Sequence, residues 1–236
     1  MSTQDPTPGD ISSADPLVQD EGSGRTNSNS KKHAFLLLGI LLCGGLGAWA
    51  WYISFQEDQN LEAQEEMFQA QYYFEADSLD KALVGDGDAL GFEDIIASYE
   101  GSPAANLANF YAGVIQVKKG EWEKAIAYLE KFEVSDWLLE ARKYALLGDA
   151  YMEKNDPKSA ASYYWKAAQK NANEFFTPLY LQKASLAYEL HKDYESALKC
   201  LSLIISDYPT SEIYQEVEKQ AIRLKTLSKL PIPGST

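Results

Sequence analysis

The clearest pattern in the chain lies in residues 141–168, ARKYALLGDAYMEKNDPKSAASYYWKAA. Two segments with apolar residues at helical spacing stand on either side of the turn-forming pair Asn155–Asp156. Small residues occupy matching places in the two segments, Gly148 in the first and Ala160 in the second. Because small side chains let helices approach closely, this stretch predicts a pair of closely crossing antiparallel helices.

The same pattern occurs on both sides of this pair, and the repetition predicts the architecture. The equivalent alanines Ala125, Ala160 and Ala197 are 35 and 37 residues apart. A helix pair of about 34 residues with such small residues is the signature of the tetratricopeptide repeat, or TPR. One repeat cannot bury its apolar face alone, so we predict an all-α TPR superhelix. The two flanking copies are NLANFYAGVIQVKKGEWEKAIAYLEKF, residues 106–132, and PLYLQKASLAYELHKDYESALKCLSLIISDYP, residues 178–209.

Partial units extend the repeats at both ends. GFEDIIASYEGSPAA, residues 91–105, is similar to the second helix of a repeat that ends at Pro103. Ser211 is a good N-cap for a final helix that would cover the open end of the stack, and prolines follow that helix. The predicted TPR domain, 91–230, thus contains a partial repeat 91–105, repeats 106–137, 141–172 and 178–210, and a capping helix 211–229, before a disordered end 231–236.

An uncharged stretch near the start predicts one N-terminal transmembrane helix, residues 33–55. AFLLLGILLCGGLGAWAWYISF, residues 34–55, is 22 residues without a charge, which as a helix is about 33 Å long and spans a bilayer core. Lys31 and Lys32 precede it, so residues 1–32 are expected in the cytoplasm and the C-terminal domain in the periplasm. We therefore predict a single-pass protein of the inner (cytoplasmic) membrane.

Two other uses of this apolar stretch are disfavoured. Thirty polar residues precede it, unlike the short basic start of a cleavable signal peptide. The apolar run continues past Cys43, unlike a lipoprotein signal, so an uncleaved signal anchor is favoured. Within the span Gly44, Gly47 and Ala48 are neighbouring small residues. They either reflect the ordinary abundance of glycine in membrane helices or form a docking face for another membrane protein.

The charges outside the repeats are concentrated in one segment. The formal net charge is −14, and residues 57–102 hold 13 acidic side chains against the single base Lys81. We expect residues 56–90 to form an acidic helical connector, and residues 1–32, which have few large apolar residues, to be a disordered cytoplasmic tail. Nucleic-acid binding would require charge of the opposite sign, so no nucleic-acid partner is expected.

The sequence predicts a binding surface rather than an active site. No metal-ligand spacing, phosphate loop or nucleophile motif occurs, so we expect no enzyme activity, cofactor or metal. The first helix of each repeat lines the concave face of a TPR superhelix, which would bind an apolar segment of a partner unless neighbouring helices cover it. The predicted lining residues are Leu107, Phe110, Val114, Val117 and Lys118, then Arg142, Ala145, Asp149, Met152 and Glu153, then Leu179, Gln182, Leu186, Glu189 and Leu190.

The layout resembles the ancillary TPR subunit of the bacterial SecYEG translocon, a single-span inner-membrane protein. The similar segments are AWAWYIS (48–54), GEWEKAIAYLEKF (120–132) and SDWLLEARKYALLGDAYMEKNDPKSAASYYWKA (135–167). The resemblance implies a role beside the translocon and a membrane-anchored periplasmic chaperone, where the domain meets secreted proteins. The alternative is an adaptor in another cell-envelope complex, for division, gliding or outer-membrane assembly.

Overall fold

The computed structural model describes residues 27–170 and 172–227, which form helices and loops without any strand. In the first helix the side chains of residues 27–37, 40, 53, 55, 56 and 58 are also outside the description. The chain divides into two compact units, residues 1–53 and 54–236. Each unit is described by itself below.

The first unit contains the beginning of helix α1, Asn27–Glu75. Helix α1 includes the last six residues of the predicted tail, 27–32, so the predicted boundary at residue 32 is wrong. Once a helix is nucleated, adding residues costs little, and polar residues can extend it. The rest of the predicted tail, residues 1–26, lies outside the described residues, and in the predicted span 34–55 the side chains of residues 34–37, 40, 53 and 55 are not described. No helix within the described ranges combines the length and apolar character that crossing a membrane requires.

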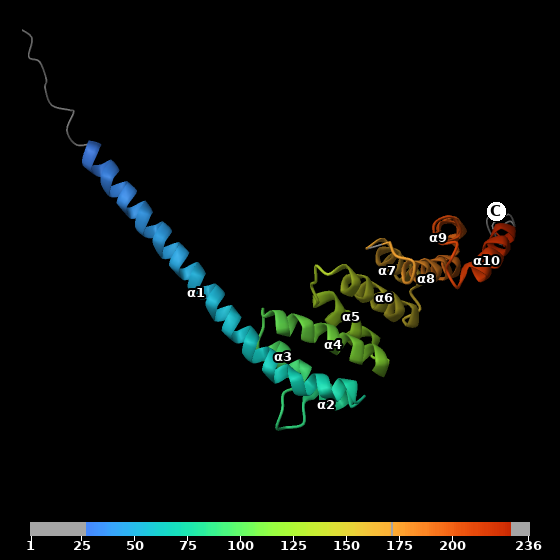
Figure 1. Ribbon diagram of the computed structural model, residues 1–236, viewed down its shortest axis with the longest axis horizontal. Helices are drawn as coiled ribbons and strands as arrows, with labels where there is room; N and C mark the ends of the chain where they lie inside the picture. Colours follow the sequence, from blue (N-terminus) through green and yellow to red (C-terminus); the bar gives the residue numbers. More distant parts are fainter. Residues whose placement is uncertain (1–26, 171, 228–236) are drawn as a thin grey trace, which may run out of the picture. The chain divides into compact units, whose positions relative to one another are not determined.

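The second unit is a series of helices that pack mainly on their neighbours in the chain (Figure 1). This nearest-neighbour packing is the arrangement that stacked helical repeats predict. After the second half of α1 come α2 Leu79–Val84, α3 Phe92–Ser98, α4 Pro103–Lys119, α5 Trp122–Lys131, α6 Trp137–Glu153, α7 Pro157–Gln169, α8 Thr177–Leu190, α9 Tyr194–Asp207 and α10 Tyr214–Leu227.

Tight turns join the helices of each pair where the sequence places turn-forming residues. Gly120, Asn155 and Lys192 adopt left-handed backbone conformations, with φ of 73°, 60° and 67°. The side chains of Asp156 and Asp193 then cap α7 and α9, each accepting a hydrogen bond of 3.1 Å from the backbone N–H three residues later. These caps satisfy donors that a helix N-terminus leaves unpaired, so each turn leads directly into the next helix.

Small residues let the two helices of a pair cross closely. A Cβ atom added to Gly113 would lie 2.7 Å from Cγ of Leu129, and one added to Gly148 would lie 2.5 Å from Cε1 of Tyr164. Ser185, the equivalent residue of the third pair, donates its hydroxyl hydrogen to a backbone carbonyl of α9 at 3.1 Å. A larger side chain at these places would push the paired helices apart.

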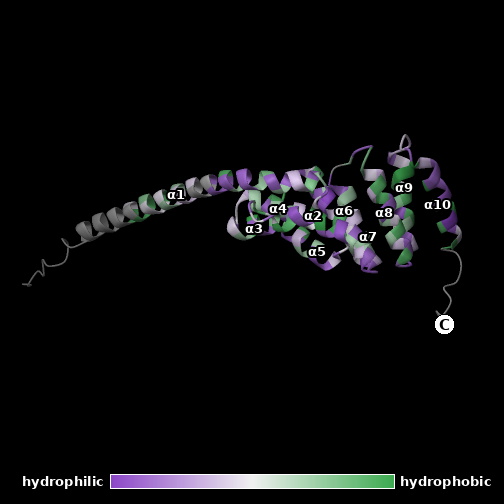
Figure 2. Cartoon of the chain, turned by 90° about the horizontal axis from the view of Figure 1, so that it is seen from below, coloured by the Kyte–Doolittle hydropathy of each residue, from purple (hydrophilic) through white to green (hydrophobic). Residues whose placement is uncertain are grey.

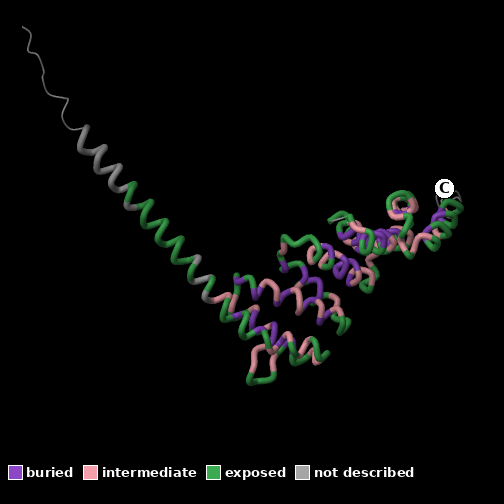
Figure 3. Tube along the Cα trace, viewed as in Figure 1, coloured by how far each residue is buried: buried purple, intermediate pink, exposed green. Residues whose placement is uncertain are grey.

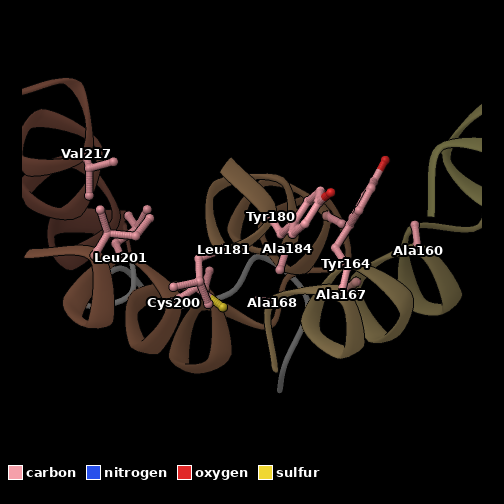
Figure 4. Packing of buried hydrophobic residues seen from close by; sticks show 14 of the residues in the cluster. Ala160, Tyr164, Ala167, Ala168, Tyr180, Leu181, Ala184, Cys200, Leu201 and Val217 are labelled. Atoms are coloured by element: carbon pink, nitrogen blue, oxygen red, sulfur yellow. The ribbon is translucent and has the colours of Figure 1, made fainter. Parts of the chain in front are cut away.

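The apolar core of the second unit consists of three clusters along the helices. Hydrophobic residues and buried residues occur along the series of helices in this unit (Figures 2 and 3). One cluster joins α1 to α4, a second joins α4, α5 and α6, and the largest joins α6 to α10. Figure 4 shows residues of the largest cluster from α7, α8, α9 and α10, among them Tyr164, Leu181, Cys200 and Val217. The core therefore runs along the stack rather than forming one centre.

The second half of α1 belongs to this stack. Ala63, Met67 and Ala70 are buried, and Met67 and Ala70 belong to the cluster that contains residues of α3 and α4. The side-chain Oδ1 of Asn60 accepts a hydrogen bond of 3.0 Å from the backbone N–H of Ala104. This part of the predicted connector thus packs on the repeats with one face, as the first helix of a pair would.

Two predicted helix boundaries are wrong. Pro103 is the first residue of α4 rather than the end of the preceding helix, and Ser102 caps α4 by accepting a hydrogen bond of 3.0 Å from Ala105 N–H. Proline suits the first turn of a helix, where its missing N–H would have no partner. Ser211 does not cap α10, which begins at Tyr214 after two short turns that include Ser211.

Candidate protein-binding face

The predicted groove residues of α4 are mostly used for packing between helices. Phe110, Val114 and Val117 are half-buried and pack in the cluster shared with α6, and the rings of Phe110 and Phe132 lie 5.0 Å apart. Leu107 packs in the cluster shared with α1 and α3. These four side chains therefore stabilise the stack, and α4 contributes little open apolar surface.

The remaining groove position of α4, Lys118, is exposed and contacts residues at the end of α1 and just after it. The Nζ atom of Lys118 lies 2.8 Å from Oδ1 of Asp77 and 5.3 Å from the centroid of the Phe74 ring. The Phe74 ring also contacts the ring of Tyr111 on α4, edge to face at 5.2 Å. The sequence-based alternative, in which neighbouring helices cover part of the groove, therefore describes the four apolar positions of α4 but not Lys118.

A fixed carboxylate joins α6, α7 and α8. Asp149 of α6 accepts hydrogen bonds from the Tyr164 hydroxyl at 2.7 Å and from Nζ of Lys183 at 2.6 Å. The same Lys183 nitrogen lies 5.4 Å from the centroid of the Tyr164 ring. Burial, together with the Asp149 carboxylate, raises the pKa of Tyr164, so its hydroxyl stays protonated as a donor. Sequence reasoning found Asp149 but missed Tyr164 and Lys183, because only the fold brings them together.

Helix α8 presents a row of exposed leucines beside this carboxylate. Leu179, Leu186 and Leu190 are 44%, 53% and 56% exposed, and their spacing of seven and four residues places them on one side of α8. We call these three residues the α8 leucine stripe. The opposite side of the helix, including Leu181, is buried in the largest cluster.

The other predicted residues border this stripe in different ways. Arg142 and Glu153 of α6 are exposed, whereas Gln182 is half-buried and Met152 packs partly in the largest cluster. Ala145 is buried in that cluster, so its predicted place in an open groove is wrong. Glu189 is held by Arg223 of α10, with both guanidinium–carboxylate contacts at 2.6 Å. Arg223 was not predicted, since a basic residue on a capping helix has no distinguishing sequence signal.

The predicted membrane docking face lies on the part of α1 in the first unit. Gly44, Gly47 and Ala48 are exposed there. A Cβ atom added to either glycine would meet no atom within 4 Å. The small residues are thus unpacked in the single chain, and their docking role stays a prediction.

The described residues contain no group of three or more His, Cys, Asp or Glu side chains that could hold a metal ion. The described chemistry of the face is therefore that of apolar contacts, fixed charges and hydrogen bonds.

A family model for the tetratricopeptide repeat matches residues 107–133 and 180–211. These ranges cover most of the helix pairs α4–α5 and α8–α9, and α6–α7 between them has the same small-residue crossing and turn. No curated protein matches the chain significantly. Repeats of this type generally act as non-enzymatic scaffolds that bind other proteins. The chain therefore has an all-helical, TPR-type repeat fold, which indicates a protein–protein interaction module.

Proposed function

We propose that the chain binds an apolar segment of a partner protein on the face formed by α6 and α8. The observation that carries this proposal is the α8 leucine stripe, three large apolar side chains left about half exposed in the single chain. Docking an apolar helix or extended segment would remove this surface from water, which is favourable at roughly 25 cal/mol per Å².

Charged groups beside the stripe support a specific orientation of the bound segment. Asp149 and Lys183 form an ion pair of 2.6 Å, and Arg142 is exposed on the same helix as Asp149. Fixed charges around an apolar contact select the partner's register and polar flanks more than they add affinity. The expected ligand is therefore amphipathic, with its apolar side on the leucines.

Photo-crosslinking from the face would test this proposal. A photoreactive amino acid at Leu186 of the full chain in native membranes should give discrete protein adducts, whereas the same group at Ser162, exposed on α7, should not. Adding Leu179→Ser and Leu190→Ser should remove those adducts, because the apolar contact is lost. Equal adducts from both positions, or adducts that persist without the leucines, would contradict the proposal.

We further propose that residues 34–55 anchor the chain in the inner membrane, with the N-terminus in the cytoplasm and the repeats in the periplasm. The support is the 22-residue uncharged sequence after Lys31 and Lys32. Leu41, Leu46 and Trp51, which are described within it, are 73%, 61% and 69% exposed on α1. Lipid would cover such apolar side chains.

Cysteine accessibility would test this topology. In a Cys43→Ser background, a Ser162→Cys variant should react with a membrane-impermeant maleimide in cells whose outer membrane alone is opened. A Ser28→Cys variant should react only after the inner membrane is also opened. The reverse pattern, or release of the protein by alkaline carbonate, would contradict the proposed anchor.

The resemblance to the ancillary translocon subunit supports a further proposal, an accessory or chaperone-type scaffold beside SecYEG. Mild-detergent purification from crosslinked native membranes should then recover the translocon channel and a membrane-anchored periplasmic chaperone. Gly44→Leu with Ala48→Leu should reduce that recovery if the small-residue face docks there. Recovery of a different envelope complex instead would favour the adaptor function and reject the translocon role.

A further inference from the structure

The second half of α1 has a second apolar surface that faces away from the repeats. On one side of the helix, Met67 and its neighbours are buried against α3 and α4. On another side Leu61, Phe68 and Tyr72 are 60%, 69% and 59% exposed. Their spacing of seven and four residues places them in one row along the helix. We call this row the α1 apolar stripe.

Acidic side chains border this stripe without any basic partner. Glu57, Glu65 and Glu75 are exposed, and at 100° per residue they fall on the two flanks of the row. In the part of the chain that the structure describes, none of these three forms an ion pair. Residues 57–80 contain no Lys or Arg. The flanking charge is therefore uncompensated.

Acidic residues close to α4 do form ion pairs, so the lack of basic partners is confined to the residues that flank the stripe. Asp77 and Asp80 at the end of this segment pair with Lys118 and Lys119 of α4, at 2.8 Å and 2.5 Å. Lys81, the one base among residues 57–102, lies with its Nζ atom 5.4 Å from the centroid of the Tyr73 ring. These three lysines therefore contact groups other than the glutamates that flank the stripe.

We propose that the α1 apolar stripe binds an amphipathic helix of a partner protein whose apolar side is bordered by Lys and Arg. Two helices pack along such rows of large side chains, and opposite charges on the flanks select the partner. Here the three apolar side chains supply the contact, and Glu57, Glu65 and Glu75 supply the charge selection. This site is separate from the α6–α8 face and does not depend on it.

The negative charge of the flanking glutamates disfavours two other occupants of the stripe, a second copy of the chain and an anionic lipid surface. A second copy of the chain would place the unpaired glutamates of one stripe beside those of the other, and like charges at such a contact are unfavourable. An anionic lipid surface would be repelled for the same reason. A basic helix is the occupant whose charge complements that of the stripe.

Two synthetic helices can test the proposal on the full chain in mild detergent. Both carry the same row of leucines and a fluorescent label, but one has Lys on both flanks and the other has Glu. The Lys helix should bind with an anisotropy change, and the Glu helix should not. Phe68→Ser should weaken binding of the Lys helix about tenfold or more, and raising the salt from about 0.1 M to 0.5 M should also weaken it.

Two further variants test the flanking charge and the independence of this site from the α8 leucine stripe. Glu65→Lys should weaken binding of the Lys helix, because it reverses one flanking charge. Leu186→Ser, which alters the α8 leucine stripe, should leave the affinity for the Lys helix unchanged within about twofold. Because Phe68, Glu65 and Leu186 are exposed, their variants should keep the circular dichroism spectrum of the parent chain.

Three results would overturn the proposal. The first is equal affinity of the Phe68→Ser variant and the parent chain for the Lys helix. The second is equal binding of the Lys and Glu helices, which would show a non-specific apolar contact. The third is a dimer of the full chain that Phe68→Ser dissociates, which would make a second copy the occupant.

Discussion

Two glycines mark the places where paired helices approach most closely. They differ in how far the side chain opposite each glycine could move to make room for a larger residue. Gly113 faces the flexible side chain of Leu129. Gly148 faces the ring of Tyr164, whose hydroxyl is held by Asp149 at 2.7 Å. The ring cannot turn away without losing that hydrogen bond. A glycine is therefore more strictly required at position 148 than at position 113.

We expect Gly148→Ala to destabilise the protein although alanine favours helices. Alanine in place of a helical glycine ordinarily stabilises by up to about 1 kcal/mol. Overpacking against Tyr164 should reverse this and lower the free energy of unfolding by about 1–3 kcal/mol. Urea unfolding of the full chain in mild detergent, followed by circular dichroism, measures the change. Ser162→Ala, at an exposed position of α7, is the control, and a more stable Gly148→Ala variant would contradict the close contact.

Cys200 should be chemically inert in the folded protein. Its side chain is fully buried in α9, and burial raises the pKa of the thiol to about 12. Because the thiolate is the reactive form, we expect alkylation at pH 8 to be on the order of 100-fold slower in the folded chain than in urea. A Cys43→Ser background leaves one thiol to follow by mass spectrometry. Equal rates in both conditions would show that α9 is not packed as described.

The turn residues and the capping residues at the ends of the helices determine where individual helices in this fold begin and end. The turn residues Asn155 and Lys192 take the left-handed conformation, and Asp156 and Asp193 cap the helices that follow. Because the left-handed conformation costs energy for residues other than glycine, the caps and the packing of the next helix must hold these turns. The caps should therefore contribute measurably to stability.

We expect Asp156→Ala to lower the free energy of unfolding by about 1 kcal/mol at pH 7, the usual value of an N-cap. Hydrogen bonds from the hydroxyl and backbone N–H of Ser159 lower the pKa of Asp156. A lowered carboxyl pKa stabilises the fold above the unfolded value of about 4, and this contribution is lost as the pH falls through the folded value. The difference between parent and variant should thus shrink below about pH 4. Glu212→Ala, at an exposed position, is the control.

At the scale of the whole second unit, stability is distributed along the stack. The cluster of α6 to α10 and the cluster of α1 to α4 share no buried residue. The intervening cluster contains Ile126, Leu129 and three residues of α6. In such a repeat stack each interface contributes its own free energy, so damage at one end should remain local.

We expect Leu224→Ala in α10 to loosen the C-terminal helices selectively. Leu224 is 1% exposed, and removing its side chain should cost about 2–4 kcal/mol through the cavity it leaves. Hydrogen exchange should accelerate in α8, α9 and α10 and remain unchanged in α3 to α5. Ile222→Ala, on the same helix but 67% exposed, is the matched control. Uniform acceleration across all helices would show that the unit opens as a single cooperative body.

Helix pairs, turns and crossing points could be predicted from the order of residues alone. Gly148 and Ala160 stand at fixed offsets from the turn at Asn155, and that spacing specifies which helix faces meet. These rules act between residues close in the chain, so local sequence contains the information. Helix ends were less predictable, since Pro103 can end one helix or begin the next, and packing selects between these uses.

The open and covered faces of the helices depend on segments distant in sequence. Positions of α4 that a single repeat would leave open, such as Phe110 and Val114, are half-buried by packing in the cluster shared with α6. Positions of α8 with the same pattern remain exposed. Whether a residue is buried depends on the side chains that surround it. The stacking of successive helix pairs determines which side chains those are. The periodicity of the sequence therefore predicts which residues could line a binding face. The tertiary packing determines which of those residues remain exposed.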